Sequence, residues 1–221
     1  MSQTPTLTPE TVAALTPLEM RLRIEDTAVV IRRPTLDETL AFLDKRAAIE
    51  HGDRPSLDHT DDGDAEILAC VTSPDVATVE ALLEDYPASS GMLREFYKML
   101  AGAGVAASLV KTTAPETLPD HKRLLAFRVT TPAHGEMTLC LKRLGRFEVK
   151  ILEVETAKAQ RSYIIASQLA PLVRSHVVSA DEDARKLARE VLDAHPLLVA
   201  ALGKRLIEAA QARIEVERGK S

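Results

Sequence analysis

Aromatic residues are scarce in this chain: Phe, Tyr and Trp make up 3% of its 221 residues, and Trp is absent. Pockets that stack a nucleobase, a flavin or a sugar usually offer aromatic faces, so the composition disfavours such ligands. The core must instead rest on Leu, Val, Ile and Ala. With 45% hydrophobic and 28% charged residues, the chain has the composition of a globular protein.

Cysteine and histidine show no pattern of a metal centre. Cys70 and Cys140 each lie in an apolar run, so we expect two buried thiols and neither a zinc framework nor a disulfide scaffold. No two histidines stand four positions apart, the helical spacing that places two imidazoles on one metal ion. The histidines are His51, His59, His121, His134, His176 and His195.

The chain also lacks a long hydrophobic run. No stretch approaches the ~18 apolar residues that a membrane span needs. The first residues do not form a basic region followed by an apolar stretch, so no signal peptide is expected. These observations predict a soluble cytoplasmic protein without a membrane partner.

Motifs of the common catalytic sites are missing. The sequence contains neither the Gly-x-Ser-x-Gly of a nucleophile elbow nor the Gly-rich loops that cradle phosphates. Gly102-Ala-Gly104 follows a predicted helix, so it is interpreted as a helix end. We therefore expect a protein that is not an enzyme, and we assign no catalytic, cofactor-binding or metal-binding residue. A small hydrolase or transferase whose site converges from scattered residues is the alternative.

One Asp-rich stretch resembles a calcium-binding loop. Asp58, Asp62 and Gly63 fall at the first, fifth and sixth positions of such a loop. The third position is Thr60, however, and the twelfth is Ala69 in place of the bidentate Glu that completes the shell. The pattern therefore favours an acidic, solvated loop over a calcium site.

Charge is unevenly distributed along the chain. Residues 1–110 contain 9 Lys and Arg against 19 Asp and Glu, a net charge of −10, whereas residues 111–221 contain 19 against 14, a net of +5. Either the two halves have differently charged solvated surfaces, or the acidic half docks against the basic half or a basic partner.

Two basic clusters lie in the second half. Without interleaved aromatic residues or a known motif, they are interpreted as solvated surfaces, and we do not expect a nucleic acid partner. The clusters are Lys142, Arg143 and Arg146, and Lys204, Arg205, Arg213 and Arg218.

The first half opens with a predicted flexible arm over residues 1–17, which holds three prolines. Residues 20–24 alternate apolar and basic side chains, and residues 27–31 form a second β-rich run. Because Glu25-Asp26 between them suits a tight turn, the two runs predict a hairpin.

Helix signals follow this hairpin. Thr35 can cap a helix over residues 36–51, with acidic residues in its first turn. A loop is predicted over 52–64. The remaining signals are an apolar, helical run at 65–71, a helix start at Ser73-Pro74 with Ser73 as the cap, a helix end at Tyr86-Pro87, and a further helix that Gly102 and Gly104 close.

The second half repeats this order. Strands are predicted at 125–129 and 137–141, a long helical stretch at 147–173 and a final helix at 197–216. Residues 147–151 also alternate like a strand, and their position in the repeat decides for a helix. Val178-Ser-Ala-Asp181 matches the helix start at Thr72–Asp75, and His195-Pro196 matches Tyr86-Pro87.

Matched positions in the two halves are about 105–110 residues apart. We therefore predict an α+β fold of two repeated modules, each a β-hairpin followed by packed α-helices and helix-rich overall. The first module spans 18–110 and the second 122–221. The segment 111–121, with Pro115 and Pro119, is predicted to be an exposed linker.

The first half resembles the tail assembly chaperones of tailed bacteriophages and prophages. The resemblance covers residues 20–100 and is carried by Arg32-Arg-Pro-Thr35, Leu68-Ala-Cys-Val-Thr-Ser-Pro-Asp75 and Leu82-Leu-Glu-Asp-Tyr-Pro87. It implies a non-enzymatic assembly protein of the host cytoplasm that binds tail or tape-measure proteins, with no catalytic residue. A structural adaptor retained in a phage or phage-like particle, and hence found in the virion, is the alternative.

Overall fold

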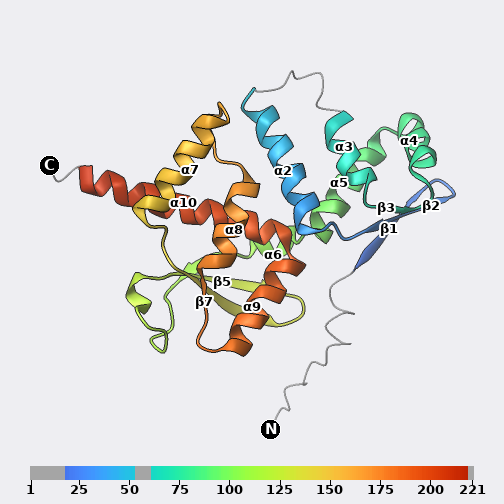
Figure 1. Ribbon diagram of the computed structural model, residues 1–221. Helices are drawn as coiled ribbons and strands as arrows, with labels where there is room; N and C mark the ends of the chain where they lie inside the picture. Colours follow the sequence, from blue (N-terminus) through green and yellow to red (C-terminus); the bar gives the residue numbers. More distant parts are fainter. Residues whose placement is uncertain (1–17, 53–60, 219–221) are drawn as a thin grey trace, which may run out of the picture.

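The structure is a computed structural model that describes residues 18–52 and 61–218 (Figure 1). It is a mixed helix and sheet protein, which confirms the predicted α+β class. One sheet has three strands in the order β1-β2-β3, and the other has four in the order β4-β5-β6-β7. Each pair of neighbouring strands is antiparallel.

The first half contains β1 (Glu19–Ile24), β2 (Thr27–Arg32), α2 (Leu36–Glu50), α3 (Asp61–Leu68), β3 (Val71–Ser73), α4 (Val76–Asp85), α5 (Ala88–Leu100) and α6 (Ala103–Ala107). The second half contains β4 (Val110–Thr112), the short 3-10 helix η2 (His121–Arg123), β5 (Leu125–Thr131), β6 (Gly135–Leu141), α7 (Arg146–Lys158), α8 (Ala166–His176), β7 (Val177–Val178), α9 (Glu182–Ala194) and α10 (Pro196–Arg218).

Both predicted hairpins are confirmed. Ile24 pairs with Thr27 at the end of the first, and the turn places Glu25 in the left-handed region at φ 50°. On the inner face of β1, Leu22 and Ile24 are buried beneath α5. The second hairpin is longer than predicted, since pairing continues to Thr131 and Gly135.

The first long helix begins as the sequence predicts. The Thr35 hydroxyl accepts a hydrogen bond from the Glu38 backbone N–H at 3.2 Å, and the Glu38 carboxylate accepts one from the Thr35 N–H at 2.8 Å. This reciprocal capping box satisfies two backbone donors that the helix itself leaves free.

The predicted cap at Ser73 is wrong. Residues 71–73 form β3 and pair with β2, and the cap of α4 is Asp75, whose carboxylate accepts from the Thr78 N–H at 3.0 Å. In the second half, Asp181 caps α9 in the same way and β7 pairs with β6. Pairing with a strand distant in sequence, which local propensity does not encode, draws these residues out of the helices.

Two other helix boundaries also differ from the sequence analysis. The stretch predicted as one helix over 147–173 is two, α7 and α8, separated by a turn in which Gln160 has φ 55°. The second helix of the first half begins at Asp61, within the predicted loop, and ends at Leu68. Residues 1–17 and 53–60, with the whole of the predicted arm and part of the Asp-rich loop, lie outside the described residues.

Each half has its own principal core, and two buried side chains of the first half belong to the core of the second. The first core includes Ile31, Phe42 and Tyr97 and consists of residues between 22 and 100. The second is built on β5, β6 and α8 to α10, but it also takes in Leu40 from α2 and Val105 from α6. The Leu197 N–H donates to the Ala101 carbonyl at 3.0 Å. These apolar and backbone contacts join the two halves and are screened little by salt. Attraction between an acidic and a basic half is therefore not needed to hold them together.

The segment 111–121 is not a fully exposed linker. Val110–Thr112 form β4 and pair with β5, so the second sheet begins at the end of the predicted first module. Ala114 and Leu118 are then buried against Ala126 and Cys140. The chain between the halves thus covers one face of the second sheet.

Replacement of Leu40 by Ala should destabilise the whole chain, because Leu40 joins α2 to the core of the other half. We expect the free energy of unfolding in urea to fall by about 3 kcal/mol. Leu18→Ala is the control and should cost less than about 0.5 kcal/mol, since Leu18 is exposed. Two transitions, with Leu40→Ala shifting only one, would contradict a core shared by both halves.

Candidate protein-binding surface

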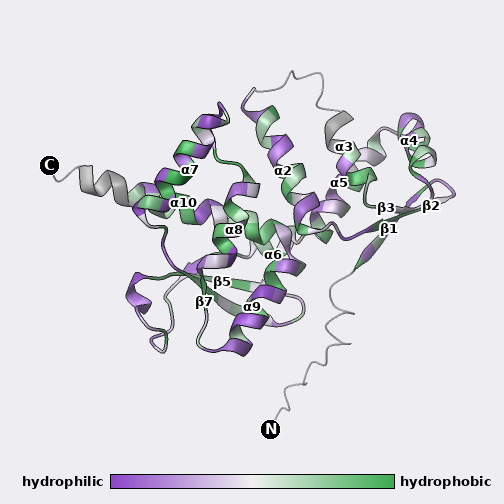
Figure 2. Cartoon of the chain, in the orientation of Figure 1, coloured by the Kyte–Doolittle hydropathy of each residue, from purple (hydrophilic) through white to green (hydrophobic). Residues whose placement is uncertain are grey.

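Three large apolar side chains are exposed on one face of α7. Phe147 is 75% exposed, Ile151 40% and Val154 43%. Their spacing of four and three residues places them in one row along the helix, which we name the α7 stripe. Leu152 and Thr156 are buried on the opposite face. The helix is therefore apolar both toward the core and toward solvent (Figure 2).

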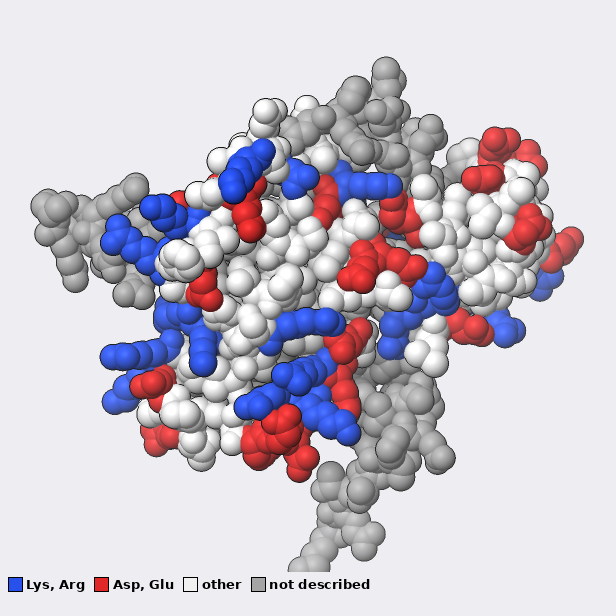
Figure 3. All heavy atoms as spheres, viewed as in Figure 1, with Lys and Arg blue, Asp and Glu red and all other residues white. Residues whose placement is uncertain are grey.

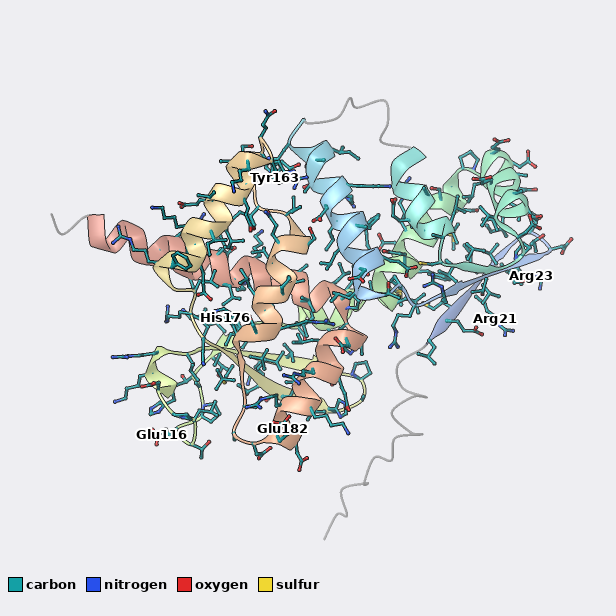
Figure 4. The ribbon with its side chains drawn as sticks, viewed as in Figure 1. Arg21, Arg23, Glu116, Tyr163, His176 and Glu182 are labelled. Atoms are coloured by element: carbon teal, nitrogen blue, oxygen red, sulfur yellow. The ribbon has the colours of Figure 1, made fainter. Side chains whose placement is uncertain are left out.

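The first turn of α7 is held by Glu148. One carboxylate oxygen accepts from the Gly145 backbone N–H at 2.7 Å, and the other lies 3.1 Å from His176 Nε2 at the end of α8. Figure 4 shows His176 at that end of the helix. Rotating α7 to bury Phe147 would break both contacts and expose Leu152. The α7 stripe is thus presented to solvent by a fixed helix.

A groove of about 830 Å³ lies on a neighbouring side of α7, between α2, α8 and α10. At its rim, the rings of His51 and Tyr163 stack with centroids 4.1 Å apart, which joins the end of α2 to the loop before α8 (Figure 4). Thr156 lines the groove, and its buried hydroxyl has no hydrogen-bond partner among the described residues. An unsatisfied buried hydroxyl favours a ligand or partner that supplies one.

The structure does not gather the histidines into one site. Within residues 18–52 and 61–218, no group of three His, Cys, Asp or Glu side chains could hold a metal ion. Asp58, the first position of the calcium-like loop, lies outside the described residues. Cys70 and Cys140 are buried, as predicted, and burial raises the pKa of the Cys70 thiol to about 11.

His195 is the most buried histidine among the described residues, with 4% of its surface exposed. It packs against Gly102, which has φ 90°; a Cβ at that position would lie 2.7 Å from the His195 Cβ. Burial, aided by the positive charge of Arg33 and by His134, lowers the pKa of His195 to about 4. The imidazole is therefore neutral at pH 7 and serves packing at the junction of the halves.

A partly buried ion pair joins Arg32 and Glu38 in the first half. Glu38 accepts from both terminal nitrogens of Arg32, at 2.8 and 2.6 Å, and this bond holds the pKa of Glu38 at about 2. Arg32 also donates to the Ala69 carbonyl at 3.2 Å. The arrangement ties β2, α2 and the turn after α3 together, so it is structural.

The predicted basic clusters are separated by the fold. Lys142 and Arg143 line a cleft with basic residues of other segments, whereas Lys204 lines the groove beside α7. The side chains of Arg213 and Arg218 lie outside the described residues.

Comparisons with models of protein families, with curated proteins and with solved structures find no match. In the described part of the chain, no helix combines the length and the apolar character of a bilayer span. The α7 stripe was not assigned as a site by sequence reasoning. Its signal was the ambiguity of residues 147–154, whose apolar residues fit both a helix and a strand because they occupy two faces of α7.

The stability of the protein should fall on mild acidification because of His195. Its pKa is lower in the folded state than its ordinary 6.5, so the unfolded chain binds the proton more readily. The contribution of the neutral His195 side chain to the free energy of unfolding is fully present above pH 6.5 and is lost between pH 6.5 and 4. From pH 7 to 5 the free energy of unfolding should therefore fall by about 2 kcal/mol. His195→Gln should remove this slope in urea titrations, and His121→Gln should keep it. An unchanged slope in His195→Gln would refute the assignment.

Proposed function

We propose that this protein is a non-enzymatic assembly protein of the phage tail type, which binds an apolar segment of a tail or tape-measure protein on the α7 stripe. The observation that carries the proposal is the exposure of Phe147, Ile151 and Val154 in one row. Rows with this spacing are typical anchors for a packed helix or an extended apolar segment. Exposed apolar patches on a protein surface mark interaction sites.

The residues that resemble the chaperone family support the proposal through the fold. Thr35 caps α2, Asp75 caps α4, and Tyr86-Pro87 separates α4 from α5. These residues therefore set where helices of the first half begin and end, and we do not propose them as a binding surface.

We also infer that the halves are diverged copies of one module. In each, a hairpin is followed by two helices, a short strand antiparallel to the second hairpin strand, and two more helices. The Arg32 N–H donates to the Cys70 carbonyl at 2.9 Å, and the Lys142 N–H to the His176 carbonyl at 2.9 Å. Pro115-Glu-Thr117 in the chain before the second hairpin matches Pro9-Glu-Thr11 before the first.

Corresponding elements agree in backbone detail as well. Tyr86 ends α4 with φ −127° and ψ 69°, and His195 ends α9 with φ −133° and ψ 73°. An experimental structure in which the two halves connected their strands in different orders would contradict the duplication.

The duplication pairs α7 with a helix of the first half. Glu38 and Glu148 both occupy the third position of their helix, so α2 and α7 correspond. The first of these helices is packed against α8 and α10 of the other half, with a hydrogen bond from the Ser167 N–H to Asp44 at 3.2 Å. Within the described residues, Phe147, Ile151 and Val154 of α7 are exposed without a covering element. We propose that a partner protein supplies it.

The test is a pull-down of the tagged protein from cells that express a complete tail operon. The variant Phe147→Ser/Ile151→Ser/Val154→Ser should lose the tail or tape-measure protein, because the apolar anchors are gone. The control Leu18→Ser/Met92→Ser/Met99→Ser alters exposed apolar residues elsewhere and should retain it. Equal recovery by both variants, at unchanged thermal stability, would refute the α7 surface.

The composition of particles made with the wild-type protein decides between the chaperone and the adaptor. A chaperone leaves before the particle is complete, so mass spectrometry of purified particles should not detect it. Stoichiometric recovery in the particles would instead establish the structural adaptor. Recovery of no tail protein in the pull-down would count against both.

A further inference from the structure

A second surface is a cleft of about 1060 Å³ between one end of the second sheet and α10. Among the described residues, five basic side chains line it: Lys111 from β4, Lys122 and Arg123 from η2, and Lys142 and Arg143 from the chain after β6. One acidic residue, Asp120, lies among them. Five positive charges against one negative charge give the lining a net charge of +4, in a protein whose net charge is −5.

These five cations have no carboxylate partner within 4.0 Å among the described residues. Elsewhere in the structure, basic side chains do pair with carboxylates, as Arg32 pairs with Glu38. In the cleft, the contact that orders a basic side chain is instead a hydrogen bond from Arg143 Nε to the Arg123 carbonyl at 3.1 Å. That bond brings two guanidinium-bearing segments together, although like charges repel. An anionic partner would offset this repulsion.

The floor of the cleft decides which anion fits. It is aliphatic, formed by Leu124, Leu125, Val178, Ala209 and Ala212. No aromatic side chain of the described residues lines the cleft, so they form no stacking platform of the kind that proteins use for single-stranded nucleic acid. A phosphate backbone would also gain little from an aliphatic floor. A peptide with carboxylates beside aliphatic side chains would satisfy both the rim and the floor.

We propose that this cleft binds an acidic peptide segment of a partner protein that carries aliphatic residues between its carboxylates. Figure 3 shows Lys and Arg side chains gathered on the side of α10 and the second sheet, and acidic side chains at the opposite end, over α4. The field of this end of the molecule therefore attracts acidic segments and orients them toward the cleft.

Fluorescence anisotropy of the full chain with a labelled peptide that repeats Glu-Leu-Glu-Ala tests the proposal. The matched Gln-Leu-Gln-Ala peptide should bind at least about tenfold more weakly. Raising the salt concentration from ~50 to ~300 mM should lower the affinity for the acidic peptide. Single-stranded and duplex DNA serve as phosphate polyanions. Tighter binding of either DNA, equal binding of both peptides, or no binding of the acidic peptide would overturn the proposal.

Charge reversal locates the site. Two double variants reverse charges on opposite walls of the cleft: Lys142→Glu/Arg143→Glu and Lys111→Glu/Lys122→Glu. Each should lower the affinity for the acidic peptide by about tenfold or more. The control Lys186→Glu/Arg189→Glu on α9 makes the same change in net charge outside the cleft. It should lower the affinity for the acidic peptide by less than about threefold. The triple Ser variant of the α7 stripe should bind the acidic peptide normally, which separates this site from the proposed tail-protein surface. Equal loss in the α9 control would show a nonspecific charge effect and refute the site.

Discussion

The fold depends on the burial of α10 against both halves of the chain. Leu198, Leu202 and Leu206 are almost completely buried on this helix. At Gly203, α8 approaches so closely that a Cβ would lie 2.8 Å from the Leu169 Cβ. In a chain nearly without aromatic residues, a dense core requires such close approach of aliphatic helices, because small side chains fill space only when the backbones come near. Leu40 from the first half enters the same core.

Glu38 and Glu148, in the first turns of α2 and α7, make similar contacts in two different surroundings. Each reaches back to a backbone N–H at its helix N-terminus, with Glu38 bound to Arg32 and Glu148 beside His176. These bonds set the rotation of each helix about its axis. For α2 that rotation points Leu40 into the neighbouring core, and for α7 it leaves Phe147 in solvent.

The proposed binding surfaces differ in physical character. The α7 stripe is apolar, so its binding should be governed by area removed from water and be insensitive to salt. The basic cleft combines charge with an aliphatic floor, so it should steer a partner at a distance and respond to ionic strength. A single extended partner with an apolar segment and an acidic segment could occupy both.

The sequence by itself determined the elements whose signals are local. The hairpin turn at Glu25-Asp26, the cap at Thr35 and the helix end at Tyr86-Pro87 are properties of neighbouring residues, and so is the burial of Cys70 in its apolar run. Tertiary structure decided what depends on distant partners: strands β3 and β7, the insertion of Leu40 into the other core, and the packing of residues 111–121 on the second sheet. It also decided both candidate surfaces. Periodicity shows that α7 has two apolar faces, and composition shows that the second half is basic. Which face is left uncovered, and which lysines and arginines converge, depends on how segments far apart in the chain pack together.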